Sequence, residues 1–354
     1  MPAPKLRIGL AGLDQWYAAL ALAEIASRRD DVELVGIADR DSARAAKIAE
    51  RFAVHQVSSE PEELAADASL DAVMTFASTD CNPGICIAAA SGGNHILSGK
   101  PMARTLEDAA RIARAVRESG VRFVAGESLF RFTGWYRQLE QWIAEDRLGE
   151  PVGAYSRFWA GLPQRWPDDD NPGWYAEPGR AAGGAWIDHA IYSIDLLRSL
   201  WRQDATRVSG TTANVRFPSL RVEDHGVGTV EFSAGPAAVL EATWAAPPGV
   251  AFEYGLRLLG TKGGATFDSR TGELSAVGTA FGSSGWADTE VGEVSEEQGL
   301  FDHFVAVAGG ADSVASVDVA QENLAVGLAF YDAVRAGTTV VPSATTHQAT
   351  GTGH

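Results

Sequence analysis

The 354-residue sequence is poor in the residues that hold small or secreted folds together, since it contains only two cysteines, Cys81 and Cys86. Two cysteines are too few for a disulfide scaffold, and they form no metal-type cluster, so we expect no metal and a reducing, cytoplasmic location. Basic residues are also scarce: 29 Lys and Arg stand against 46 Asp and Glu, a formal net charge of −17. That balance argues against binding to nucleic acid or to anionic membranes.

Long hydrophobic runs are missing as well. No apolar stretch reaches the roughly 18 residues that a membrane span needs. The first residues run directly into a predicted strand, so we expect no signal peptide. No segment repeats at a fixed period, and the length suits a soluble protein of two domains.

The segment 71–104 organises the first half of the chain. Its apolar run 71–77, small-residue helix 85–90 and second apolar run 95–98 predict a strand, a helix and a parallel strand. Open α/β sheets bind ligands at the carboxyl ends of such strands. Lys100 lies at one of these ends, and we expect it to take part in chemistry; an ordinary surface lysine is the alternative.

Residues 6–38 show the order strand, turn, helix and strand that is typical of a dinucleotide-binding unit. An acidic residue follows, Asp39, placed to accept the ribose hydroxyls. The glycine-rich turn is incomplete, because Gly12 is present but Asp14 and Tyr17 replace the second and third glycines. Asp14 brings a carboxylate to the place of a pyrophosphate, which is repulsive, although Asp is also a good helix N-cap.

The two halves of the chain differ in pattern. Helix and strand signals alternate through 1–124, which predicts a doubly wound parallel sheet, a Rossmann domain. Successive strands without helices over 207–267 predict an α+β second domain, 125–338, with a large open antiparallel sheet. The polar end, 339–354, is expected to be a flexible tail. We also expect a homodimer or homotetramer, because an open sheet leaves a broad apolar face.

Two segments of the second domain carry candidate site residues. In the predicted helix 184–201, Asp188, Tyr192 and Asp195 share one stripe, with His189 at its margin. These groups form either a site or a buried stripe with satisfied hydrogen bonds.

The second segment is the long loop 161–180, in which Trp166, Trp174 and Tyr175 accompany three aspartates. Flat aromatic faces beside carboxylates suit a sugar, and long loops in compact domains are often functional. An ordinary surface loop is the alternative.

Several motifs taken together resemble the glucose–fructose oxidoreductase/inositol dehydrogenase (Gfo/Idh/MocA) family over about residues 5–338. They are KLRIGLAG, Gly99-Lys100-Pro101, GRAAGGAWIDHAIYSIDLL, VEDH, GTKG and VAQENLAVGLAFYDAV. The resemblance implies a Rossmann domain followed by a substrate domain with an open antiparallel sheet. It also implies hydride transfer between a nicotinamide cofactor and a sugar, polyol or related hydroxyl compound.

The resemblance assigns roles residue by residue. Lys100 matches the lysine of the family's Glu-Lys-Pro motif, which hydrogen-bonds the reacting oxygen. Asp188 matches the aspartate of its Asp-(three residues)-His motif. Tyr192 replaces the motif histidine, and Gly99 replaces the glutamate. A tyrosine base would need Lys100 to lower its pKa; His189 is the alternative base.

The resemblance also implies NAD as the cofactor, with NADP possible. Arg40 could accept a 2′-phosphate, but Asp39 would repel it, which favours NAD. The expected cofactor contacts are Gly12, Leu13, Asp14, Asp39, Arg40, Ala77, Ser78, Asn82 and Lys100.

Two other functions stay open. Some family members use the cofactor only transiently, to cleave glycosides or epimerise a substrate. The second open alternative is a non-enzymatic relative whose cofactor turn has degraded, and Asp14 and Tyr17 in place of glycines favour it.

Overall fold

The structure is a computed structural model that describes residues 4–167, 169–250, 252–282, 285–292 and 294–343. The predicted tail, 339–354, lies mostly outside these residues. Its described part is not free of the fold, because Val340 pairs with Val208 in an isolated antiparallel bridge.

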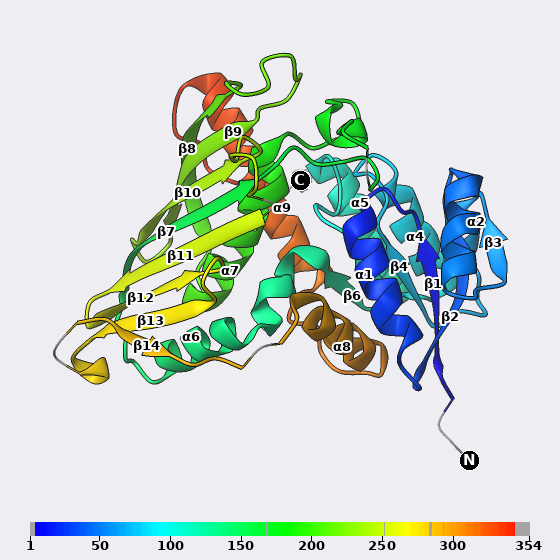
Figure 1. The fold of residues 1–354 in the computed structure, drawn as a ribbon, viewed down its shortest axis with the longest axis horizontal. Coiled ribbons are helices and arrows are strands. Elements are labelled where there is room, and N and C mark those ends of the chain that lie inside the picture. Colours follow the sequence, from blue (N-terminus) through cyan, green and yellow to red (C-terminus); the bar gives the residue numbers. More distant parts are fainter. Residues whose placement is uncertain (1–3, 168, 251, 283–284, 293, 344–354) are drawn as a thin grey trace, which may run out of the picture.

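The first sheet has six strands in the order β3-β2-β1-β4-β5-β6, and all paired neighbours run parallel. This is the strand order of the doubly wound dinucleotide fold, so the predicted Rossmann domain is confirmed. Figure 1 shows it as the blue-to-cyan body. Its strands are β1 (Leu6–Ala11), β2 (Val32–Ala38), β3 (Gln56–Ser58), β4 (Ala72–Thr75), β5 (His95–Ser98) and β6 (Phe123–Ala125). Its helices are α1 (Trp16–Ser27), α2 (Ser42–Arg51), α3 (Pro61–Ala65), α4 (Asn82–Gly92) and α5 (Leu106–Ser119).

The order of the strands reverses between β1 and β4, and this point positions the site. The chain leaves β1 towards β2 on one side and later returns to β4 on the other. Ligands of open α/β sheets bind in the crevice that this reversal opens at the carboxyl ends of the strands. Gly12 follows β1, Asp39 follows β2 and Lys100 comes just after β5, so all three stand at that edge.

The second sheet has eight strands in the order β14-β13-β12-β11-β7-β10-β9-β8. It is mixed rather than wholly antiparallel, because β7 and β10 pair in parallel. The long connection between them lets the chain re-enter the sheet in the same direction. The strands are β7 (Pro151–Ala160), β8 (Ala205–Ala213), β9 (His225–Phe232), β10 (Ala237–Thr243), β11 (Phe252–Gly260), β12 (Gly263–Asp268), β13 (Glu273–Gly278) and β14 (Ala287–Thr289).

Helices cover one face of this sheet and join it to the Rossmann domain (Figure 1). Trp186 stacks on Phe330 with ring centroids 3.7 Å apart, which fixes the last helix against the sheet. The longer helices are α6 (Gly134–Ala144), α7 (Ile191–Trp201), α8 (Glu296–Ala308) and α9 (Val317–Ala336), with short turns η1 (Gly126–Phe132), η2 (Gly173–Ala176), η3 (Trp186–Ala190) and η4 (Thr279–Phe281). Among the described residues, no helix is long and apolar enough to cross a membrane.

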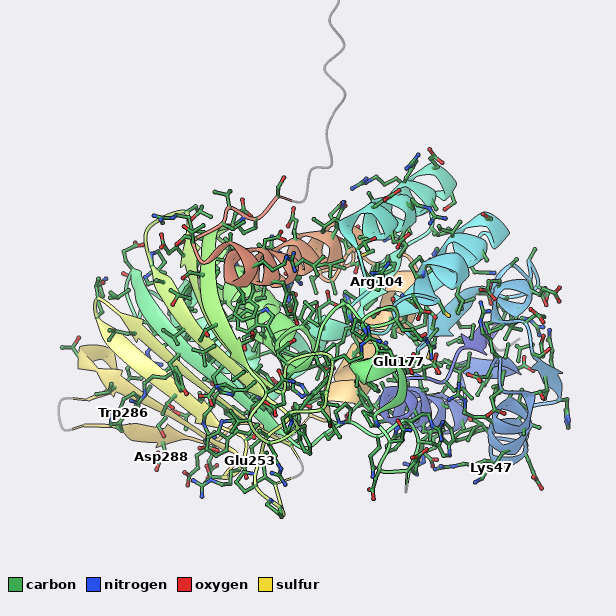
Figure 2. All side chains as sticks on the ribbon, turned by 90° about the horizontal axis from the view of Figure 1, so that it is seen from above. Lys47, Arg104, Glu177, Glu253, Trp286 and Asp288 are labelled. Carbon is green, nitrogen blue, oxygen red and sulfur yellow. The ribbon has the colours of Figure 1, made fainter. Side chains whose placement is uncertain are left out.

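The open face of the second sheet is less apolar than expected. Glu241 accepts hydrogen bonds from Tyr155 and Trp159, and Arg157 pairs with Asp268. This face lies away from the Rossmann domain, with Trp286 and Asp288 at one end of the molecule and Lys47 at the other (Figure 2). The proposed division at residue 124 falls within β6.

Candidate active site

A cavity of about 720 Å³ lies at the junction of the two domains. The first domain contributes the end of β5 and the start of α1, and the second contributes η3, α7, β7 and β11. Four predicted catalytic residues line it together: Lys100, Asp188, His189 and Tyr192. The fold thereby brings Lys100 to three residues that lie 88 or more positions later in the sequence.

Lys100 and Asp188 form a buried ion pair at the base of the cavity. The Lys100 ammonium donates to both the carboxylate and the backbone carbonyl of Asp188. Burial opposes the charge on Lys100, but the Asp188 carboxylate outweighs it and raises the Lys100 pKa. An ammonium has three N–H donors, so the third is left for the nearby Tyr17 hydroxyl or for a ligand that takes its place in the cavity.

Asp188 is held on both of its oxygens. The indole of Trp244 donates to Oδ2 over 3.0 Å, while Lys100 binds Oδ1. Burial would raise its pKa, but Lys100 first and His189 next favour the carboxylate, and the pKa falls to about 2. Asp188 therefore stays charged and fixes the orientation of its neighbours.

His189 lines the cavity without a hydrogen-bond partner. It is only 8% exposed, and neither ring nitrogen makes a hydrogen bond. Its Nε2 lies 3.4 Å from Asp188 Oδ2, close enough for electrostatic attraction. Burial nevertheless lowers the pKa of His189 to about 4, so the neutral ring offers a hydrogen-bond acceptor to a ligand.

Tyr192 does not become the lowered-pKa base that the sequence suggested. Burial raises its pKa well above the usual value, and the charge of Lys100 offsets this only in part. Lys100 Nζ lies 5.0 Å from the centroid of the Tyr192 ring, a cation–π contact with its face. Tyr192 therefore forms part of the wall under Lys100.

Tyr17 and Tyr175 are the other hydroxyls near Lys100. The Tyr17 ring is 42% exposed, but its hydroxyl end is buried, and burial raises its pKa although Lys100 acts to lower it. The Tyr175 hydroxyl is buried without a hydrogen-bond partner. Tyr17 was predicted only as a replacement for a glycine of the phosphate turn, and its position in this cavity was not predicted.

Glu296 closes the far side of the cavity and was not predicted. It lies in the first turn of α8, accepts a 2.6 Å hydrogen bond from Tyr254, and burial raises its pKa to about 7. No local motif marks it, because only the folding of α8 against the second sheet brings it there.

Three predicted substrate residues lie outside the cavity. Asp195 is fully buried and binds Arg131, Ser128 and Asn323. It lies apart from Asp188 because the predicted helix begins with the π turn η3 and so breaks the expected stripe.

The loop 161–180 lines one side of the large cavity and also covers the phosphate turn, but two of its predicted aromatic residues lie at the turn. Trp166 packs against Trp16 and the Arg44 guanidinium, and the Trp174 indole donates to the backbone carbonyl of Asp14. Tyr175 alone of the three predicted aromatic residues lines the cavity.

Asp39 is committed to the protein itself. It is 2% exposed, accepts the Leu13 N–H over 2.7 Å, and is bound on both oxygens by the Arg44 guanidinium. Burial raises its pKa, and Arg44 pulls it the other way. Asp39 and Arg40 both line a second, smaller cavity of about 330 Å³, where Arg40 pairs with Glu62.

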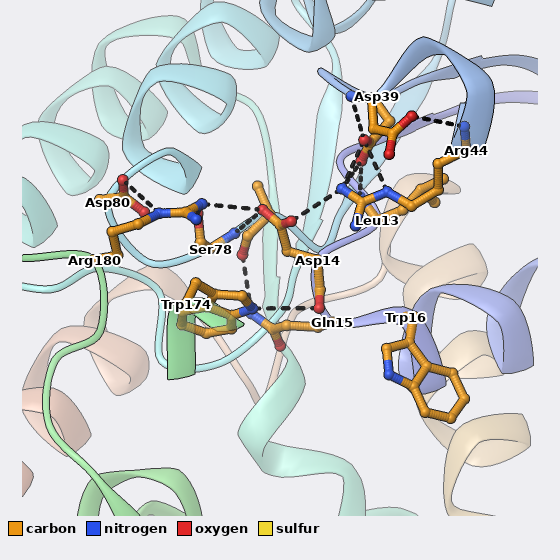
Figure 3. A network of polar contacts seen from close by, with 12 residues as sticks. Leu13, Asp14, Gln15, Trp16, Asp39, Arg44, Ser78, Asp80, Trp174 and Arg180 are labelled. Atoms are coloured by element: carbon orange, nitrogen blue, oxygen red, sulfur yellow. Dashed lines mark hydrogen bonds and ion pairs between the residues drawn. The ribbon is translucent and has the colours of Figure 1, made fainter. Parts of the chain in front are cut away.

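Asp14 lies between the two cavities at the centre of a polar network (Figure 3). Its carboxylate accepts the Ser78 N–H at 2.9 Å and the Arg44 guanidinium at 3.0 Å, and lies 3.8 Å from Arg180. The repulsive carboxylate that the sequence suggested is thus neutralised. It is not a cap of α1, whose N-terminus has no side-chain cap.

Gln15 occupies the space left by the missing glutamate of the Glu-Lys-Pro motif. A Cβ at Gly99 would lie 2.7 Å from the Gln15 Oε1 atom. The amide donates to the Ala77 carbonyl and accepts the Lys100 N–H. Asn82 was expected at the cofactor, but its side chain is buried and hydrogen-bonds Thr75, Ser98 and the Met102 carbonyl.

The residues fit a dinucleotide at three places. The small cavity beside Asp39 lies along the crevice. The turn after β1 has the positive φ, 83° at Gly12, that a close approach of the backbone to a phosphate requires. The large cavity contains Lys100. Between them, two guanidinium groups and a backbone N–H surround an anion, which is the donor set of a phosphate, with the Asp14 carboxylate as stand-in. No group of three or more His, Cys, Asp or Glu in the described residues could hold a metal ion.

Known proteins resemble this chain over both domains. Residues 6–127 match a family described as oxidoreductases with an NAD-binding Rossmann fold, and residues 136–266 match the GFO/IDH/MocA C-terminal domain. 1,5-Anhydro-D-fructose reductase of Ensifer adhaerens is 30% identical over 58% of this chain and 60% of its own length. The scyllo-inositol 2-dehydrogenase (NAD(+)) of Bacillus subtilis is 26% identical over 77% of both chains.

A solved structure extends the likeness to the whole fold. Levoglucosan dehydrogenase, in complex with NADH and levoglucosan, superposes with a TM-score of 0.84 at 21% identity, over 96% of this chain and all of that one. With both domains matched in order, the chain belongs to the Gfo/Idh/MocA family of oxidoreductases.

Proposed function

We propose that the protein is an NAD(P)-dependent oxidoreductase that acts on a hydroxyl group of a sugar, cyclitol or related polyol. The observation that supports this is the pairing of one spare Lys100 donor with the unpartnered His189 ring in a single cavity. A substrate hydroxyl can accept a hydrogen bond from Lys100 and donate one to His189.

Lys100 stabilises the negative charge that develops on the oxygen as the alcohol becomes a carbonyl. Its ammonium is fixed by Asp188 in a buried site, where such a donor is most effective. Asp188 keeps Lys100 in place and attracts a proton towards His189.

His189 receives the hydroxyl proton. Its nitrogens are neutral and unpaired, whereas the Tyr192 hydroxyl has a raised pKa. The pKa of His189, about 4, already includes the attraction of Asp188, so His189 is a weak base, and the transfer relies on Lys100 to stabilise the oxygen that loses the proton.

When bound, the nicotinamide cofactor supplies the acceptor for the hydride that leaves the carbon. The residues proposed to hold it are Gly12, Asp39, Arg40, Ala77, Ser78 and Lys100, with NAD as the proposed cofactor and NADP possible. Leu13 contributes its backbone, and Asn82 supports the cavity only through the core.

The cavity favours an uncharged substrate. Among the described residues of its lining, Lys100 is the only fully charged basic side chain, and its charge is already paired with Asp188. Asp170, Glu296 and Glu297 add carboxyl groups at the other side. A phosphorylated or acidic sugar would find no free cation, whereas aromatic walls suit the apolar faces of a polyol ring.

The test is a screen of neutral sugars and inositols with NAD and NADP, followed by absorbance of the reduced nicotinamide. Turnover of a neutral polyol that is lost in Lys100→Met supports the proposal. Product formed without net reduced cofactor would instead indicate transient oxidation. If NADH does not bind at all, the proposal is wrong.

We also propose a homodimer or homotetramer formed through the open sheet face, on which the exposed Val239 and Leu259 accompany the Glu241 network. The two free cysteines support a cytoplasmic location. Sedimentation analysis tests the assembly.

A further inference from the structure

The Asp14 carboxylate occupies an anion cradle that the chain builds from both domains (Figure 3). Ser78 donates its backbone N–H from the loop after β4, and Arg44 donates from α2. Arg180 comes from the end of the loop 161–180, in the second domain. The Asp14 carboxylate is only 20% exposed, whereas the Arg180 side chain is 37% exposed, so the arrangement lies at the edge of the crevice, within reach of a ligand.

Arg180 is held in place by more than Asp14. Its Nη2 donates to the Ser78 hydroxyl over 2.7 Å, its Nε lies 3.3 Å from Asp80, and its carbonyl accepts from Thr79. Trp174 adds a contact to the Asp14 carbonyl. The guanidinium would therefore remain over the crevice if the Asp14 carboxylate moved away.

The cradle lies between the cavity beside Asp39 and the cavity that holds Lys100, since Asp14 and Arg180 line the first and the start of α1 lines the second. A dinucleotide that reaches both must place its pyrophosphate between them. Guanidinium groups and backbone N–H groups are the usual ligands of phosphate.

We propose that Arg44, Arg180 and the Ser78 N–H form the pyrophosphate-binding site of this protein, and that Asp14 is an internal competitor for it. When the cofactor binds, its pyrophosphate takes the place of the Asp14 carboxylate in the cradle. Arg180 thereby makes the second domain a direct ligand of the cofactor in place of the two missing turn glycines. This inference rests on the proposed cofactor of the preceding subsection.

The test is a titration of the full chain with NADH, followed by energy transfer from the protein's tryptophans. Asp14→Asn removes the competing charge but keeps the shape, so we expect NADH to bind about tenfold more tightly. Arg180→Met removes a phosphate ligand, and we expect about tenfold weaker binding. Inorganic pyrophosphate should compete with NADH, and more strongly in Asp14→Asn.

Asp169→Asn is the matched control, because it removes from the loop 161–180 a carboxylate whose one charged partner among the described residues is Arg165. It should leave NADH affinity unchanged, and thermal unfolding of each variant checks the fold. If wild type binds NADH but Asp14→Asn does not tighten binding, or Arg180→Met does not weaken it, the inference is wrong and the proposed function stands. If Asp14→Asn binds and wild type does not, the inference holds and the proposed function is wrong. If neither binds, both are wrong.

Discussion

The two ends of the crevice differ in how far the protein satisfies its own polar groups. At the Lys100 end, both His189 nitrogens and the Tyr175 hydroxyl are buried without partners. At the Asp39 end, the carboxylates of Asp14 and Asp39 accept seven hydrogen bonds between them. Buried unpaired groups cost free energy until a ligand pairs them, whereas paired groups must be released before a ligand can bind.

This comparison explains why one site looks ready for a ligand and the other looks closed. The substrate end gains hydrogen bonds on binding and loses none. At the cofactor end, hydrogen bonds within the protein are replaced by hydrogen bonds to the cofactor. The affinity there is therefore the difference between two free energies of similar size. Catalytic variants should therefore act most strongly at the Lys100 end.

The largest effect is expected for Lys100→Met. The substitution removes the donor to the reacting oxygen and leaves the Asp188 charge buried without its cation. We expect kcat to fall by about 10³-fold, while NADH affinity changes less than about threefold. Steady-state kinetics and NADH titration measure the two, and circular dichroism verifies folding. Turnover near the wild-type rate would show that Lys100 is a structural residue.

A paired substitution separates the two candidate bases. His189→Gln removes the proposed proton acceptor, and we expect a loss in kcat of about 10²-fold or more. Tyr192→Phe keeps the ring under Lys100, and its loss should stay within about threefold because only the hydroxyl disappears. The reverse ranking would assign the proton transfer to Tyr192.

The sequence predicted the elements of both ends but not their state of pairing. Apolar periodicity and the glycine at position 12 sufficed for the Rossmann sheet, because these signals are local. Lys100 was predicted from its place after a strand and Asp188 from the polar stripe of a helix, and the motif resemblance then assigned their roles. The cradle around Asp14 could not be predicted, since Arg44 and Arg180 reach it from 30 and 166 positions away and no spacing encodes that contact. Asp195 was wrongly predicted to share a site with Asp188, because the π turn at 186–190 changes the helical spacing and carries no clear sequence signal.

A buried unpartnered group outside the crevice sharpens the comparison. Glu127 is 1% exposed, neither of its oxygens has a partner, and burial, with the nearby Asp195 charge, raises its pKa to about 7. Because this pKa exceeds the unfolded value, the folded state loses stability as pH rises from about 4.5 through 7.

Glu127→Gln should remove this loss. We expect the variant to be more stable by about 1–3 kcal/mol at pH 8 and to show no gain at pH 4.5. Denaturant unfolding at both pH values measures it. The exposed Glu118→Gln is the control and should show no such pH dependence. An equal gain at both pH values would rule out ionisation of Glu127 as the cause.

The smallest effect concerns the space shared by Gly99 and Gln15. A methyl group at position 99 would lie 2.7 Å from the Gln15 side-chain oxygen, so Gly99→Ala must displace an amide that binds Ala77 and Lys100. We expect a loss of about 1–2 kcal/mol in unfolding free energy, and almost none when the same change is made in Gln15→Ala. Denaturant unfolding of the four proteins gives the coupling energy. If Gly99→Ala costs the same in wild type and in Gln15→Ala, the Gln15 amide moves aside freely. The Gln15 side chain would then not be the steric reason for the glycine at position 99.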